Sequence, residues 1–305
     1  MSTGSITPTA PFLDLSPPFS EREAARVCLL PVPYDATTSY RPGARFGPSA
    51  LIAASHQVEL FDEQLQADTY RIGIHTGPPV PPNVAGPEAM IGDVARAYTH
   101  LLDENKFVAL VGGDHSTALG AIQALRQRRA DRPFAVVQFD AHRDLRDEYE
   151  SSRWSHACVS ARIVEWGLPL LQLGVRAWSR EEQERAAQAA MTTLTARDLL
   201  ETDAHTRIAD FLRHQPRDIY LTFDLDVFDP SIMPSTGTPE PGGLLWYQTL
   251  DLLESVVRTS NVIGLDLVEL APIAGLTAPD LLAARLLYRL LGFVARDWPR
   301  MNAAD

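Results

Sequence analysis

The sequence is poor in cysteine and has no long apolar run. Its 305 residues include only two cysteines, Cys28 and Cys158, which excludes a disulfide framework and fits a reducing compartment. No apolar segment approaches the roughly 18 residues that a membrane span needs. The N-terminus also lacks the basic-then-apolar pattern of a signal peptide. We therefore expect a cytoplasmic protein with no membrane partner.

Positive charge is also scarce. The chain has 27 Lys and Arg against 39 Asp and Glu, a formal net charge of -12. This balance argues against nucleic acid or an anionic membrane as a partner and mildly favours a cationic substrate. Hydrophobic residues make up 45% of the chain, enough to bury the core of one large α/β unit.

Apolar segments that predict strands alternate with segments that predict helices. This alternation indicates an α/β fold of three layers, αβα, with a mainly parallel sheet. No linker or repeat divides it, so we predict a loosely structured leader at 1–24 and a single domain at 25–305. The predicted strands lie at 26–32, 107–111, 134–139, 170–175, 219–223 and 262–267. The predicted helices lie at 49–61, 87–104, 116–128, after Ser179, at 245–258 and at 278–295.

The segment 139–144 (FDAHRD) is the most informative part of the chain. It follows an apolar strand, and alternate side chains of an extended chain point the same way. Asp140, His142 and Asp144 can therefore face one point. Two carboxylates and an imidazole are costly to hold together without a counter-charge, and a divalent cation is the natural one.

Two more polar clusters follow strands. His115 lies in 112–116 (GGDHS), and Asp224 and Asp226 lie in 223–226 (FDLD). Taken singly, these residues could be packing or capping groups. Ligands of parallel sheets, however, bind beyond the carboxyl ends of the strands, where all three clusters fall. Six ligands, four of them carboxylates, suit two divalent cations roughly 3.5–4 Å apart, and oxygen-rich ligation favours Mn²⁺ over a structural Zn²⁺. The predicted chemistry is metal-assisted hydrolysis.

In these polar motifs and in others along the chain, the sequence resembles the ureohydrolase superfamily of arginases and agmatinases. Thr222 stands where that family usually has Ser, and Arg143 where it often has Thr, but neither position is a ligand. The resemblance runs from about residue 26 to the C-terminus and implies the arginase/deacetylase-like fold, with a ureohydrolase catalytic domain. The motifs that carry it are 112–116, 140–144, 223–226 with the following 229–230, and 264–269, with further agreement at 42–48 and 236–243.

The resemblance implies two Mn²⁺ ions per subunit and a division of the ligands between them. Asp140 and Asp224 would bridge the two ions. A hydroxide between the ions would attack the guanidinium carbon and release urea and a primary amine. One ion would be held by His115, Asp140, Asp144 and Asp224, and the other by Asp140, His142, Asp224 and Asp226.

Three residues receive catalytic roles from the same resemblance. Asp144 would relay a proton to the leaving nitrogen, and Glu269 would pair with the guanidinium, which suits a carboxylate bidentately. His156 lies where the family carries a proton-shuttling histidine, although a histidine in a surface loop is common. Asp114 and Asp266 are expected to support their neighbours rather than bind metal.

The substrate depends on the segment 145–150 (LRDEYE). Arginases use an asparagine just after the 140–144 motif to bind the amino-acid end of arginine, and this chain lacks it. We therefore predict agmatine, hydrolysed to putrescine and urea. The acidic residues Asp147, Glu148 and Glu150, or the segment 61–63, could attract its distal amine.

Other activities remain open at this point. Arg143 and Arg146 could serve a carboxylate, as in 4-guanidinobutyrate, and N1-aminopropylagmatine would also suit an acidic pocket. Outside the class, a deacetylase-like amide hydrolase with one zinc or an inactive binding subunit are the alternatives. By resemblance alone we expect a homo-oligomer, a trimer or a hexamer.

Overall fold

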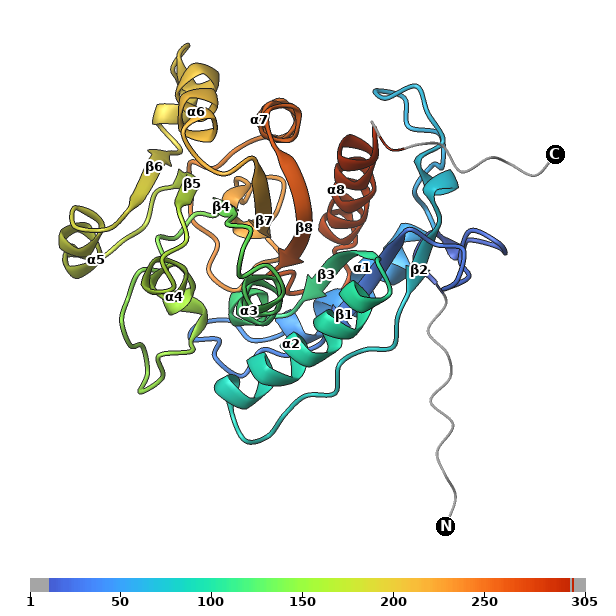
Figure 1. The fold of residues 1–305 in the computed structure, drawn as a ribbon, viewed down its shortest axis with the longest axis horizontal. Coiled ribbons are helices and arrows are strands. Elements are labelled where there is room, and N and C mark those ends of the chain that lie inside the picture. The colour runs from blue at the N-terminus through green and yellow to red at the C-terminus, as the bar shows by residue number, and fades with distance from the viewer. Residues whose placement is uncertain (1–10, 297, 299–305) are drawn as a thin grey trace.

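Eight strands form one sheet whose pairings are all parallel, in the order β2-β1-β3-β8-β7-β4-β5-β6 (Figure 1). The computed structural model describes residues 11–296 and 298. The predicted fold class is confirmed, and the sheet is wholly rather than mainly parallel. The strands are β1 Val27–Val32, β2 Ile74–Thr76, β3 Phe107–Gly112, β4 Ala135–Phe139, β5 Leu170–Val175, β6 Met191–Thr195, β7 Asp218–Asp224 and β8 Asn261–Val268.

Helices cover both faces of the sheet. Alternate strand residues supply the two cores: Val27 and Leu29 of β1 pack on the side of α1, α6, α7 and α8, while Cys28 and Leu30 pack on the side of α2, α3 and α4 (Figure 1). Burial on both faces explains why the central strands read as continuous apolar runs. The helices are α1 Gly47–Ser55, α2 Pro87–Asp103, α3 Ala118–Arg128, α4 Val159–Glu165, α5 Arg180–Ala186, α6 Ala204–Arg213, α7 Trp246–Thr259 and α8 Ala278–Ala295.

Several predicted elements need correction. The helix predicted at 49–61 ends at Ser55, and the chain turns back through residues 56–61, where the Tyr288 hydroxyl donates to the Leu60 carbonyl. Strands β2 and β6 were not predicted, nor were helices α4 and α6. Both strands lie at the edges of the sheet, and β6 is largely unburied, so neither carries the apolar run of a central strand.

The described part of the predicted leader is packed rather than loose. Phe12, Leu13 and Leu15 are buried. The Phe12 N–H donates to Thr76 Oγ1 (2.9 Å) and the Leu13 N–H to Ser55 Oγ (2.7 Å), so this segment is fixed to β2 and α1. Residues 1–10 of the predicted leader lie outside the described residues. Within the described part of the chain, no helix is long and apolar enough to cross a membrane.

The polar clusters leave the sheet from four adjacent strands. The sheet order places β3, β8, β7 and β4 side by side, and all four run in the same direction. Their carboxyl ends therefore lie at one edge, which is where parallel α/β sheets bind ligands. His115 follows β3, Asp140 follows β4, Asp224 ends β7 and Glu269 follows β8.

Candidate metal centre

His115 faces three carboxylates at this edge. Its Nδ1 lies 3.1 Å from Asp140 Oδ2, 3.2 Å from Asp144 Oδ2 and 3.3 Å from Asp224 Oδ2. The nitrogen is buried and makes a well-directed hydrogen bond with none of them. One nitrogen thus faces three carboxylate oxygens without a hydrogen bond to any of them. His115, Asp140 and Asp144 form a group that could hold a metal ion.

A second group of ligand-type atoms lies beside the first. His142 Nδ1 is 2.8 Å from Asp226 Oδ2 and 3.7 Å from Asp140 Oδ1. Asp140 therefore belongs to both groups, one through each carboxylate oxygen. Five of the six predicted ligands form two candidate metal sites that share Asp140, and Asp224 lies next to His115 of the first site. Asp224 Oδ1 accepts the Asp226 N–H (2.8 Å), so bridging by Asp224 stays a prediction.

Two carboxylates of this centre, Asp144 and Asp224, lack sufficient positive charge around them, whereas His142 outweighs the burial of Asp226 and lowers its pKa to about 2. Burial and the neighbouring Asp140 raise the pKa of Asp144 to about 7. Burial, with repulsion by Asp226 and Asp140, raises the pKa of Asp224 well above its usual range. A divalent cation would supply the missing charge, so the residues present fit a metal ion.

The pKa values of the two histidines are raised as well, which for an imidazole favours the charged form. Burial opposes the charged form of His115, but the facing Asp140, Asp144 and Asp224 carboxylates outweigh it and raise its pKa well above the usual value. Likewise, Asp226 overcomes the burial of His142 and raises its pKa. Both imidazoles therefore occupy negative surroundings that would favour a cation in place of a proton.

Hydrogen bonds orient His115 for this role. Its Nε2 lies 2.8 Å from Thr222 Oγ1, whose hydroxyl donates to Asp266 Oδ1 (2.8 Å). Because the hydroxyl proton goes to Asp266, the Thr222 oxygen accepts from His115 Nε2–H. His115 Nδ1 then carries no proton in the neutral ring, and its lone pair can bind a metal ion. Thr222, which departs from the family pattern, thus keeps a hydroxyl where it is needed. Asp266 is fully buried, which raises its pKa to about 6.

Glu269 is fixed beside the same histidine. Its Oε1 accepts the His115 N–H (2.7 Å), and its own N–H donates to the Gly113 carbonyl (2.8 Å). Glu269 and Asp144 both have left-handed backbones, with φ of 67° and 50°. Non-glycine residues keep such conformations where the surroundings enforce them, as at functional sites.

His156 lies in a short 3-10 turn next to the centre. Its Nδ1 is 3.3 Å from Thr37 Oγ1 and 3.2 Å from Ser155 Oγ, and its ring stands edge-on to Tyr149 at 5.9 Å. Burial lowers its pKa. A neutral imidazole at this position is able to accept and release protons.

A cavity of about 320 Å³ opens onto the metal centre. His142, Asp144 and His156 are among the residues that line it. Sequence reasoning assigned no role to most of the other polar and aromatic lining residues. Arg143 and Arg146 were considered as partners for a substrate carboxylate. Of the remaining charged and aromatic lining residues, Glu240 could have been noticed, because it lies in the segment 236–243 that contributes to the family resemblance. The charged and aromatic residues that also line the cavity are Arg143, Arg146, Tyr149, Trp178, Glu182 and Glu240.

A sequence model described as the arginase family matches residues 25–292. The chain belongs to the arginase family. It is 39% identical over 277 residues to the N(1)-aminopropylagmatine ureohydrolase of Synechocystis sp., covering 88% of this chain and 89% of that relative. It is 34% identical over 289 residues to the agmatinase of Pyrococcus horikoshii, covering 93% and 97%.

The fold is similar to that of a ureohydrolase of known structure. The crystal structure of the agmatine ureohydrolase of Thermoplasma volcanium superposes with a TM-score of 0.82 at 26% identity, covering 96% of both chains. This arginase-family protein is a ureohydrolase, a hydrolase that acts on guanidino compounds. The prediction of the enzyme class is confirmed, and the deacetylase-like and non-enzymatic alternatives lose their support.

The acidic residues of the segment 145–150, predicted to attract the distal amine of the substrate, do not line the cavity of this arginase-family enzyme. Asp147 binds Arg162 (2.6 Å), Arg153 (3.2 Å) and Arg185 (3.3 Å), and these ion pairs lower its pKa to about 2. Glu148 and Glu150 are exposed and do not line the cavity.

The second acidic candidate, 61–63, is also wrong as an amine site. Asp62 is buried and pairs with the buried Arg289 of α8, which also bonds Glu63 (3.0 Å). This ion pair joins the turn after α1 to α8. The segment does not line the cavity at the metal centre.

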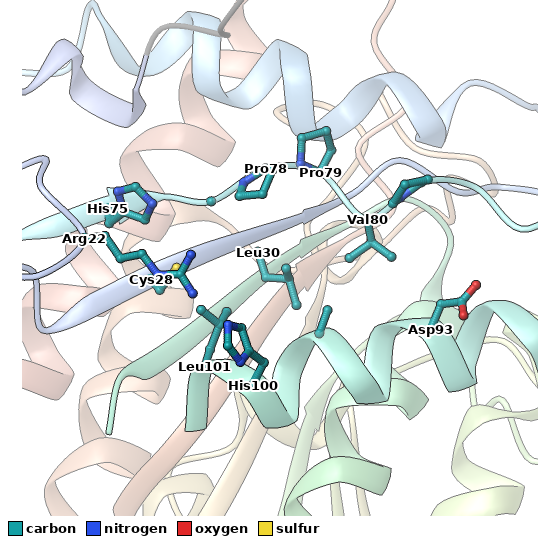
Figure 2. Close-up of a pocket in the computed structure, with 13 residues that line it drawn as sticks. Arg22, Cys28, Leu30, His75, Pro78, Pro79, Val80, Asp93, His100 and Leu101 are labelled. Atoms are coloured by element: carbon teal, nitrogen blue, oxygen red, sulfur yellow. The ribbon is translucent and has the colours of Figure 1, made fainter. Parts of the chain in front are cut away.

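A larger cavity, of about 480 Å³, lies between α2 and the proline-rich segment 77–81 (Figure 2). Its walls are mainly apolar. The basic side chains at one end, Arg22 and His100, both contact Glu104, at 2.6 and 3.2 Å. It contains none of the six predicted ligands, so the hydrolytic chemistry belongs to the smaller cavity.

Proposed function

We propose that this enzyme is a two-Mn²⁺ ureohydrolase that converts N1-aminopropylagmatine into urea and spermidine. The support is the higher identity to the N(1)-aminopropylagmatine ureohydrolase, 39%, than to the agmatinase, 34%. Agmatine, the substrate predicted from the sequence, is the second candidate. Both molecules end in amines, which the cavity beside the metal centre can meet with a free carboxylate.

The proposed ligands are His115, Asp140, Asp144 and Asp224 for one ion, and Asp140, His142, Asp224 and Asp226 for the other. Two ions held by these residues would supply Lewis acidity and would lower the pKa of a water molecule toward neutrality. Four carboxylates and two imidazoles without thiolate favour Mn²⁺.

The residues of the chain orient the substrate and move its protons. Glu269 Oε1 is committed to the His115 N–H (2.7 Å), which leaves Oε2 for the guanidinium. Asp144 lines the cavity and is the proposed proton donor to the leaving amine. His156 Nδ1 contacts hydroxyl groups, so Nε2 remains for proton exchange with solvent.

The first prediction concerns Glu269. Glu269→Gln is expected to lower kcat/KM about 100-fold, because the amide cannot pair with the guanidinium as an anion does. The amide oxygen can still accept the His115 N–H, so Mn²⁺ content should stay at two ions per chain. Urea release and metal analysis measure both. Unchanged kcat/KM in a fully loaded variant would remove Glu269 from the substrate site.

The second prediction tests the substrate. With Mn²⁺, urea release is expected to rank N1-aminopropylagmatine first by kcat/KM, agmatine second, and 4-guanidinobutyrate and L-arginine far below. A first place for agmatine would return the main assignment to an agmatinase. Urea from none of the four compounds would defeat the proposed function, and one tightly bound Zn²⁺ per chain would defeat the two-Mn²⁺ assignment.

A further inference from the structure

Two carboxylates that are not proposed metal ligands line the cavity, Glu182 and Glu240. We propose that Glu240 is the specificity residue that binds the ammonium at the far end of the butyl chain. That ammonium is primary in agmatine and secondary in N1-aminopropylagmatine. The inference rests on the proposed function and names the residue that selects cationic substrates at the same site.

Glu182 is not free to bind a substrate. It is 3% exposed, and its Oε1 accepts the Leu145 N–H (3.0 Å) while its Oε2 accepts the Ser179 N–H (2.7 Å). The second bond completes a capping box at the start of α5. Both oxygens of Glu182 therefore serve to join α5 to the segment that follows the metal ligands.

Glu240 has no such commitment. Its side chain is 40% exposed, and among the described residues its nearest cationic partner is His142, whose Nε2 lies 3.9 Å from Glu240 Oε1. No described Lys or Arg pairs with it. Arg176 attracts the carboxylate through its charge but donates its hydrogen bonds to carbonyl groups, including that of Glu240. The carboxylate oxygens at the cavity wall are therefore available for the ammonium of a ligand.

The main chain of Glu240 is nevertheless held in place. Arg176 Nη2 donates to the carbonyls of Glu240 (2.8 Å) and Asp226 (2.7 Å), and Asp229 Oδ2 accepts the N–H groups of Gly242 and the next residue (2.9 and 3.1 Å). One arginine thus ties the Glu240 segment to a proposed metal ligand. The main chain that carries the carboxylate is therefore held in place before substrate binds, so only the side chain has to become ordered.

The arginines of the cavity do not neutralise Glu240. Arg143 stacks on Trp178, with its guanidinium carbon 4.6 Å from the ring centre, and Arg146 stacks on Tyr149 at 5.0 Å. Arg143 also donates to Gln183 (3.1 Å). Their charges therefore lie against the aromatic wall. A substrate carboxylate at the position proposed for the ammonium would face Glu240 as a like charge, which disfavours 4-guanidinobutyrate.

The test is Glu240→Gln, with the exposed Glu148→Gln as the matched control. We expect KM for N1-aminopropylagmatine and for agmatine to rise about 10- to 30-fold with little change in kcat. For butylguanidine, which lacks the amine, KM should not change. Glu148→Gln should behave as the wild type. A second variant, Glu240→Lys, should instead lower KM for 4-guanidinobutyrate.

Glu240 could alternatively act only by supporting His142. In that case Glu240→Gln would weaken Mn²⁺ binding to the metal-free protein in calorimetry and lower activity equally on butylguanidine, and the inference would be overturned. Unchanged KM values on the amine substrates would overturn it as well.

Spermidine binding to the Mn²⁺-loaded protein separates this inference from the proposed function, because it needs no turnover. The wild type is expected to bind spermidine about 10-fold more tightly than Glu240→Gln. If the wild type releases no urea but this difference is found, the proposed function fails and the cation site stands. If urea is released and the difference is absent, only the cation site fails.

Discussion

Asp140→Asn is expected to lower kcat/KM by at least ~1,000-fold, because it removes the one carboxylate shared by both candidate metal sites. Asp140 Oδ2 lies against His115 Nδ1, and Oδ1 faces His142 Nδ1. An amide keeps the shape of the side chain but offers one neutral oxygen. Neither ion would then retain its full set of anionic ligands.

Metal stoichiometry and thermal unfolding measure this effect without turnover. Ligands that bind only the native state raise its stability, so Mn²⁺ should raise the melting temperature of the wild type. The rise should be small or absent in Asp140→Asn. The matched control is Asp251→Asn, an exposed position on α7, which should keep both metal content and activity. Near-normal turnover with two bound ions in Asp140→Asn would show that Asp140 does not bridge.

Gly113→Ala is expected to destabilise the protein by about 3 kcal/mol or more and to weaken metal binding. A Cβ at Gly113 would lie 1.9 Å from the Tyr34 carbonyl oxygen. That contact is with backbone, which cannot rotate away. The same Tyr34 oxygen accepts the Asp114 N–H (2.8 Å), and the Gly113 carbonyl accepts the Glu269 N–H (2.8 Å). Relief of the clash would therefore displace His115 and Glu269 together.

The control for this prediction is Gly92→Ala, inside α2. The nearest atom to its Cβ is an Arg96 guanidinium nitrogen at 3.6 Å, so the methyl group fits. Alanine favours the helix, and this variant should be more stable by about 0.5–1 kcal/mol. Denaturant unfolding of the metal-free proteins compares the two. A Gly113→Ala protein as stable as the wild type, with two bound ions, would contradict the close approach of residues 34 and 113.

Much of the fold could be predicted because its signals are local. The final helix was predicted at 278–295, which is where α8 begins and ends. The central strands are buried on both faces, and their apolar runs marked them. The helix predicted at 49–61 ran too far, because the turn after Ser55 is fixed by contacts with α8 rather than by a nearby glycine or proline. The short edge strand β2 had no apolar run of its own.

The sequence by itself determined the fold class, the family and the predicted metal ligands. Alternation along the chain predicted that Asp140, His142 and Asp144 lie close together. In the structure β4 ends at Phe139 and Asp144 has a left-handed backbone, so the fold of the segment after the strand, rather than the strand period, places these side chains. The trimer or hexamer expected from the resemblance stays a prediction.

Only the tertiary structure decided which charged groups near the centre are already paired. Asp147 looked available in the sequence but is held by arginines of α4 and α5, and Glu182 is committed to two backbone N–H groups. Glu240, on a distant segment, has no Lys or Arg ion-pair partner among the described residues and lies 3.9 Å from His142. The reason is physical: periodicity specifies the face on which a side chain lies, whereas its partners depend on which segments the sheet order brings together.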